Sequence, residues 1–275
     1  MKKKYIKFII GLIITLLFMF PIYWMIITSL KTEPEMNAYP PTFFPENITF
    51  RGYADQLSAR SRLPIISYFI NSLILAGLTL LISTALSTLS AYGLARFNLK
   101  INKYILLVFL ITQMLPIVLF YAPLFILFRN IGLFDSLLAP VISTCLHAIP
   151  FSILTLTPYF LTIPKELESA ALIDGCDKLT TFLYVMVPIV YPGILVIAAF
   201  SFIFGWGDLM GPLTFIRTES KLPLTVNMYK AIGEYGTDWN SLMAFAVVVT
   251  MPVMIIFIAL QKHLVSGLAT GSVKG

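Results

Sequence analysis

Six long stretches of this sequence contain no Asp, Glu, Lys or Arg. They are Phe8–Ile27, Tyr68–Ala95, Tyr104–Phe128, Ser136–Pro164, Leu179–Gly207 and Trp239–Gln261. A helix needs about 20 apolar residues to cross a bilayer. All six stretches reach that length. The pattern therefore predicts six transmembrane helices, at about 8–30, 68–95, 104–129, 136–163, 179–209 and 239–263.

Composition supports a membrane protein. Hydrophobic residues make up 58% of the chain and charged residues 12%, whereas a soluble domain carries about 25% charged residues. We therefore expect an all-α membrane protein and, because no flexible linker divides the chain, a single transmembrane domain over 1–275. The first apolar run follows four lysines, but it is longer than the apolar part of a signal peptide, so we expect a transmembrane helix there.

Positive charge sets the expected orientation, because cytoplasmic loops of membrane proteins are rich in Lys and Arg. With the amino terminus inside, the cytoplasmic segments hold eleven of the 19 basic residues: Lys2, Lys3, Lys4, Lys7, Arg96, Lys100, Lys103, Lys165, Lys178, Lys262 and Lys274. We therefore expect both termini in the cytoplasm of a multi-pass cell-membrane protein. The basic balance then reflects topology and contact with anionic lipid rather than nucleic acid.

The first outer loop, 31–67, is rich in proline and aromatic residues. Proline prevents one long helix there. The aromatic side chains suggest a packed cap on the outer surface rather than a free linker.

Motifs of catalysis are absent from the sequence. It contains no phosphate-binding loop, no paired metal-ligand motif and no nucleophile elbow. We therefore expect no catalytic residue, no metal site and no cofactor bound by this chain. This counts against a membrane enzyme. An ion-coupled transporter is also disfavoured, because we find neither inverted repeats nor acidic residues near the middle of a span.

A short polar segment, 164–188, interrupts the apolar pattern between the fourth and fifth spans. Glu166 and Glu168 fit the first turn of a helix. Gly175 fits the end of that helix, and Asp177 can cap the next one. The segment therefore predicts a short cytoplasmic helix, a turn and a second helix. Its face of small residues suits a protein groove better than a lipid surface.

The same segment resembles the EAA loop of ATP-binding-cassette importer permeases. Ser169-Ala170-Ala171, three residues, Gly175, nine residues and then Val185-Met186-Val187-Pro188 reproduce its spacing. The stretches "IPKELESAALIDGCD", "SLKTEPE", "QMLP", "FGWGDLMGPL" and "LVSGLATGSVKG" are similar to the carbohydrate-uptake branch, in particular to the maltose-type second permease subunit. The resemblance covers essentially the whole chain.

This resemblance implies a coupling helix that docks on a cytoplasmic ATPase. The implied contact residues are Glu168, Ser169, Ala170, Ala171, Asp174 and Gly175. The family's motif glutamate falls at Ser169. Glu168 stands one position earlier, about 100° around the helix, so either it supplies the charge from another direction or that contact is lost.

The resemblance also implies partners and a substrate class. The partners would be a homologous permease subunit, two ATPase subunits that use ATP and Mg, and an extracytoplasmic sugar-binding protein. The solute would be a sugar or oligosaccharide, with a non-sugar solute as the alternative. Four residues offer polar or aromatic groups that suit a sugar, although each also fits a packing role: Asn71, Gln113, Trp206 and Asp208.

Overall fold

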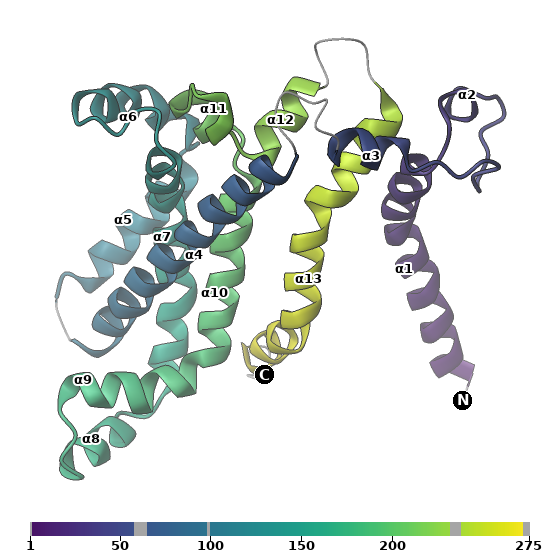
Figure 1. Cartoon of the computed structure of the whole chain (residues 1–275). Coiled ribbons are helices and arrows are strands. Elements are labelled where there is room, and N and C mark those ends of the chain that lie inside the picture. Colours follow the sequence, from purple (N-terminus) through teal and green to yellow (C-terminus); the bar gives the residue numbers. More distant parts are fainter. Residues whose placement is uncertain (1, 58–64, 98–99, 232–237, 272–275) are drawn as a thin grey trace. The chain divides into compact units, whose positions relative to one another are not determined.

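The computed structural model describes residues 2–57, 65–97, 100–231 and 238–271, and these residues form helices joined by turns and loops (Figure 1). The helices are α1 (Lys2–Ser29), α2 (Glu33–Met36), α3 (Arg51–Leu57), α4 (Ile65–Arg96), α5 (Asn102–Met114), α6 (Val118–Asn130), α7 (Leu138–Thr162), α8 (Lys165–Ile173), α9 (Lys178–Thr180), the π-helix η1 (Thr181–Met186), α10 (Val187–Gly207), α11 (Met210–Phe215), the 3-10 helix η2 (Glu219–Lys221), α12 (Leu224–Ala231) and α13 (Trp239–Gly271).

Among the described residues, five helical stretches are long and apolar enough to cross a membrane, and the bent pair α5–α6 would make six. The predicted all-helical membrane class is therefore confirmed. Four predicted spans match α1, α4, α7 and the continuous run from α9 to α10. The sixth matches α13, which continues to Gly271.

The third predicted span differs from the structure. In place of one helix over 104–129, α5 and α6 meet at an angle of 99°. Pro116 explains the break, because the residue before a proline disfavours the helical conformation. Leu115 indeed has an extended backbone, with φ −87° and ψ 130°. A break at membrane depth leaves backbone carbonyls free for other partners.

The chain divides into two compact units. The first comprises Met1–Ser67 and Asn227–Pro252. Within it, the Asn240 side-chain amide donates to the backbone carbonyls of Ser29 (3.0 Å) and Lys31 (2.8 Å). The Glu35 carboxylate accepts hydrogen bonds from the Thr42 hydroxyl and the Glu46 backbone N–H. These bonds give the described part of the 31–67 loop internal contacts, but its aromatic side chains Tyr39, Phe44 and Phe50 are exposed, so the packed cap stays a prediction. Residues 58–64 of that loop lie outside the described residues.

The second unit comprises Tyr68–Val226 and Val253–Gly275, and α4, α7 and α10 form its centre. Three fully buried serines join these helices: Ser201 donates to Ser83 at 3.0 Å, and Ser152 lies 3.4 Å from each. Small hydroxyl residues let membrane helices approach closely. Gly205 of α10 completes this close approach, because a Cβ there would lie 2.8 Å from the Ala76 Cα of α4.

An aspartate fastens the loop after α11. Asp135, between α6 and α7, accepts hydrogen bonds from the backbone N–H groups of Arg217 and Thr218 and from the Lys221 ammonium group. The Thr218 hydroxyl also donates to Asp135. This hydroxyl bond contributes most to holding the pKa of the Asp135 carboxyl well below its ordinary value, and the backbone N–H bonds come next. Asp135 adopts the left-handed conformation, with φ 58°, which aspartate tolerates better than most residues. We call residues 217–221 the fastened loop.

Candidate functional site

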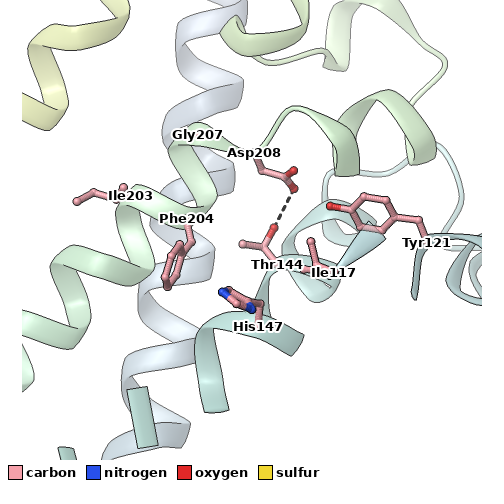
Figure 2. A pocket seen from close by; sticks show the side chains of 8 residues that line it. All are labelled: Ile117, Tyr121, Thr144, His147, Ile203, Phe204, Gly207 and Asp208. Carbon is pink, nitrogen blue, oxygen red and sulfur yellow. Dashed lines mark hydrogen bonds between the residues drawn. The ribbon is translucent and has the colours of Figure 1, made fainter. Parts of the chain in front are cut away.

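A pocket of about 240 Å³ opens where α6, α7 and α10 converge (Figure 2). Eight residues line it: Ile117, Tyr121, Thr144, His147, Ile203, Phe204, Gly207 and Asp208. All of them belong to the second unit. The wall is mostly apolar, and a few polar groups converge on it, which is the usual composition of a small-molecule site.

Asp208 supplies the acidic group of this pocket and is half-buried. α10 ends at Gly207, and the extended backbone of Asp208 turns the chain toward α11. One carboxylate oxygen accepts the Thr144 hydroxyl at 2.9 Å, and the other accepts the Gly211 backbone N–H at 3.0 Å. A carboxylate offers about four acceptor positions. Asp208 is therefore held in a fixed orientation and keeps capacity to accept further hydroxyl groups.

Ring side chains form much of the remaining wall. The His147 ring lies edge-on to Phe204, with centroids 5.2 Å apart. Tyr121 packs edge-on against Phe215 at 5.6 Å, and Figure 2 shows its hydroxyl directed toward Asp208 and Thr144. The pocket thus combines a carboxyl group, hydroxyl groups, an imidazole and two aromatic rings, those of Tyr121 and Phe204.

The other three predicted pathway residues do not line this pocket. The Asn71 amide donates to the backbone carbonyls of Ser220 (2.8 Å) and Leu222 (3.0 Å). Gln113 donates to the backbone carbonyl of His147 at 3.1 Å, so it contacts a lining residue without lining the pocket itself. Trp206 is 4% exposed and stacks on Phe202. A role of these three residues in the pathway stays a prediction.

Sequence reasoning did not select Thr144, Tyr121 or Phe204. Thr144 and His147 lie three residues apart, hence on one face of α7. That spacing is the available signal in the sequence. Among the described residues, no group of three or more His, Cys, Asp or Glu side chains is placed to hold a metal ion.

The interrupting segment lies at the other end of this unit, where α8 and α9 project beyond α7 and α10 (Figure 1). Gly175 ends α8 with φ 92°. Asp177 caps α9 by accepting the Thr180 backbone N–H at 2.7 Å. Hydrogen bonding to the Thr180 side chain, and then to its backbone N–H, holds the pKa of Asp177 below its ordinary value. The predicted helix, glycine stop and second helix are all present.

The predicted docking residues divide between two faces of α8. Ser169, Ala170, Asp174 and Gly175 are exposed, and the Ser169 hydroxyl donates to the Lys165 carbonyl. Ala171 is 8% exposed and is turned inward. Glu168 is also turned inward, where it accepts the Tyr92 hydroxyl. Leu167 and Ile173, which sequence reasoning did not select as contacts, add exposed apolar surface beside Ala170.

A family profile described as the inner membrane component of binding-protein-dependent transport systems matches residues 83–270. The chain belongs to this family. The permease is 34% identical over 99% of its length to the sulfoquinovosyl glycerol transport system permease protein SmoH of Agrobacterium fabrum, of which it covers 94%. It is 31% identical over 93% of its length to the diacetylchitobiose uptake system permease protein DasC of Streptomyces coelicolor, of which it covers 92%.

The fold also matches a solved structure. A crystal structure of a bacterial ABC transporter involved in the import of the acidic polysaccharide alginate superposes with a TM-score of 0.79. The sequences are 20% identical, and the match covers 94% of this chain and 95% of that one. The permease is therefore a multi-pass inner-membrane component of a transport complex, with the ABC importer fold.

Proposed function

We propose that the permease moves a sugar or oligosaccharide into the cell as part of an ATP-driven importer. An extracytoplasmic binding protein delivers the sugar, a homologous permease subunit completes the pathway, and two cytoplasmic ATPase subunits use ATP and Mg. The observation that carries this proposal is the alignment with SmoH, a permease named for a sugar derivative, over 99% of this chain. DasC, named for another saccharide, supports it.

The chemistry of the pocket suits this substrate class. Sugars carry hydroxyl groups that donate to carboxylates and apolar C–H faces that pack on aromatic rings. Asp208, held by Thr144, supplies the carboxylate. Phe204 and Tyr121 supply the rings. We assign the pocket to the solute pathway, with Asp208 accepting a sugar hydroxyl.

Reconstitution tests the substrate class. The permease would be co-purified with the partners encoded beside it and placed in liposomes. Binding protein loaded from a panel of mono- and oligosaccharides, amino acids and short peptides would then be added. We expect at least one saccharide to stimulate both ATP hydrolysis and uptake. Stimulation by a non-sugar solute alone would favour the alternative substrate class and refute the sugar assignment.

Substitution of Thr144 tests the pocket. Thr144→Val removes the hydroxyl that orients Asp208 while keeping the shape of the side chain. We expect the KM for uptake to rise about tenfold, the cost of one hydrogen bond to a charged group. Thr157→Val is the matched control, because Thr157 bonds to the backbone of the same helix, at the Ile153 carbonyl, and does not line the pocket. Equal KM values for the two variants would exclude the pocket from the pathway.

We further propose that α8 is the coupling helix, on the cytoplasmic side together with both termini. The exposed face of α8 around Ala170 would dock in a groove of an ATPase subunit, with Ser169, Asp174 and Gly175 beside it. Ala170→Arg would insert a long charged side chain into that contact, so we expect the ATPase to be lost from the purified complex. Leu172→Arg, about 200° around the helix, should retain it. Retention in both variants would contradict docking through this face.

A further inference from the structure

An ion pair and a hydrogen bond fasten α8 to the end of α4. The Glu168 carboxylate lies 3.0 Å from Nε of Arg96 and accepts the Tyr92 hydroxyl at 2.6 Å. The Arg96 side chain is 5% exposed and that of Glu168 is 21% exposed. We call Tyr92, Arg96 and Glu168 the anchor.

Further contacts tie the anchor to two more segments. Nη2 of Arg96 donates to the backbone carbonyl of Ile163 at 3.0 Å, at the end of α7. The Tyr92 ring packs against Phe182 of η1, with centroids 4.9 Å apart, and against Phe160 of α7 at 5.6 Å. The anchor therefore joins four segments, namely α4, the end of α7, α8 and η1.

The burial of the anchor makes it hard to separate. Parting Arg96 from Glu168 would leave the buried Arg96 charge unpaired, which is strongly unfavourable. Exposed ion pairs, in contrast, contribute little and break readily. Any displacement of α8 should therefore carry the end of α4 with it.

The same geometry separates Glu168 from the exposed face of α8. Ala170 is two residues later, about 200° around the helix, and it is exposed. The Glu168 carboxylate is thus engaged within this chain and faces away from the surface on which a partner would dock.

We propose that the anchor makes α8 and α4 one rigid body, through which displacement of the docked ATPase reaches the transmembrane pathway. Tyr92, Arg96 and Glu168 act as positioning residues, and Glu168 does not contact the ATPase. This inference rests on the proposed function. Ser169 stands where the family's motif has a glutamate. The neighbouring Glu168 does not replace that docking charge; it holds α8 to α4.

Spin labels on the two helices measure the rigid body directly. Leu172→Cys on α8 and Leu81→Cys on α4 would be labelled in the assembled complex, with Cys145 and Cys176 replaced by alanine and serine. Both labelled positions are exposed in this chain. We expect one narrow distance distribution that a non-hydrolysable ATP analogue leaves unchanged. A nucleotide-dependent shift in the otherwise native chain would overturn the proposal.

Glu168→Gln then weakens the anchor while nearly preserving its shape. We expect the ATPase to co-purify as before and a second, nucleotide-dependent distance to be observed. The number of ATP molecules hydrolysed per sugar transported should rise about tenfold, a factor within the range that is typical of coupling between two sites. Glu166→Gln is the matched control, because it neutralises an exposed carboxylate of the same helix and should leave the distance narrow.

The double variant Arg96→Gln/Glu168→Gln distinguishes loss of the anchor from general misfolding. Two glutamines leave no unpaired charge, so this double variant should be more stable than Arg96→Gln alone. Loss of the ATPase in Glu168→Gln would place Glu168 in the docking contact and refute the proposal. An unchanged distance in Glu168→Gln would refute the anchor. A complex in which the native chain supports no ATP-driven uptake would instead refute the proposed function.

Discussion

The Asp135 carboxylate holds Thr218 by two hydrogen bonds, one from its backbone N–H at 2.8 Å and one from its hydroxyl at 2.5 Å. Asp135 precedes α7, whereas Thr218 belongs to the fastened loop after α11. Asp135 therefore holds this loop from one side, while Asn71 holds it through the Ser220 carbonyl. In the proposed orientation it faces the side on which the binding protein docks.

Asp135→Asn should loosen the fastened loop. Asparagine tolerates the left-handed backbone of this position, so the variant isolates the loss of charge and of acceptor capacity. We expect trypsin to cleave after Arg217 about tenfold faster, because the loop opens more often. Glu219→Gln, in the same loop, is the control and should leave the cleavage rate unchanged. Equal rates for all three proteins would contradict the role of Asp135.

Acid should release the same loop. The folded-state pKa of Asp135 is depressed, chiefly by the Thr218 hydroxyl, then by backbone N–H groups. Its stabilising contribution is therefore fully present above its ordinary pKa of about 3.9 and is lost as the pH falls through the lowered folded value. Hydrogen exchange of residues 216–222, corrected for intrinsic rates, should show protection down to about pH 4 and a decline below it. In Asp135→Asn this dependence should be absent.

Gly205→Ala should destabilise the second unit. Its methyl group would lie 2.8 Å from the Ala76 Cα and 3.0 Å from the Thr79 hydroxyl, so the backbones of α4 and α10 must separate. We expect a loss of about 1–3 kcal/mol, seen as a lower Tm in detergent. Gly77→Ala is the matched control, since its methyl group meets nothing within 4 Å. A Tm unchanged by Gly205→Ala would contradict this close helix contact.

Asn71→Asp should reduce stability rather than substrate affinity. The change removes two N–H donors and places a carboxylate against the carbonyls of Ser220 and Leu222. We expect a loss of about 2–3 kcal/mol with an unchanged KM for uptake. Asn37→Asp is the control, because that exposed amide makes one bond, to the Glu33 carbonyl. A raised KM at unchanged stability would instead return Asn71 to the pathway.

Gly211→Ala should disturb the pocket although Gly211 itself does not line it. The added methyl group would collide with the Asp208 carboxylate, which Gly211 holds through its N–H. We expect the KM of the transported saccharide to rise about tenfold while the complex still assembles. Gly77→Ala is the control, because Gly77 does not line the pocket and its added methyl group meets nothing within 4 Å, so this variant should behave like the native chain. If the two variants have the same KM, the orientation of Asp208 does not matter for uptake.

Local signals in the sequence predicted local structure well. Gly175 and Asp177 end one helix and begin the next because their backbone preferences act within a few residues. The long apolar runs form the long helices because a helix satisfies its own backbone hydrogen bonds where no water is present. The break at Pro116 was missed because hydropathy counts apolar residues and does not register backbone geometry. The bend follows from Leu115, whose conformation the proline restricts.

The site needed the three-dimensional packing. Asp208, Thr144 and Tyr121 come from three different segments, and no spacing within the chain relates them. Glu168 was correctly placed on the short helix, but the sequence could not show its direction. That direction depends on Arg96 and Tyr92, which belong to a different span.

The three buried serines at the centre of the second unit have a consequence for movement. Each hydroxyl both donates and accepts, and it reorients by rotating one bond. Ser83, Ser152 and Ser201 already lie at 3.0 to 3.4 Å from one another, so a small slide of one helix exchanges hydrogen-bond partners instead of leaving a group unsatisfied. At the centre of the second unit, these hydroxyl groups therefore allow small slides between α4, α7 and α10 at little cost, whereas a buried ion pair in the same place would hold the helices in one arrangement.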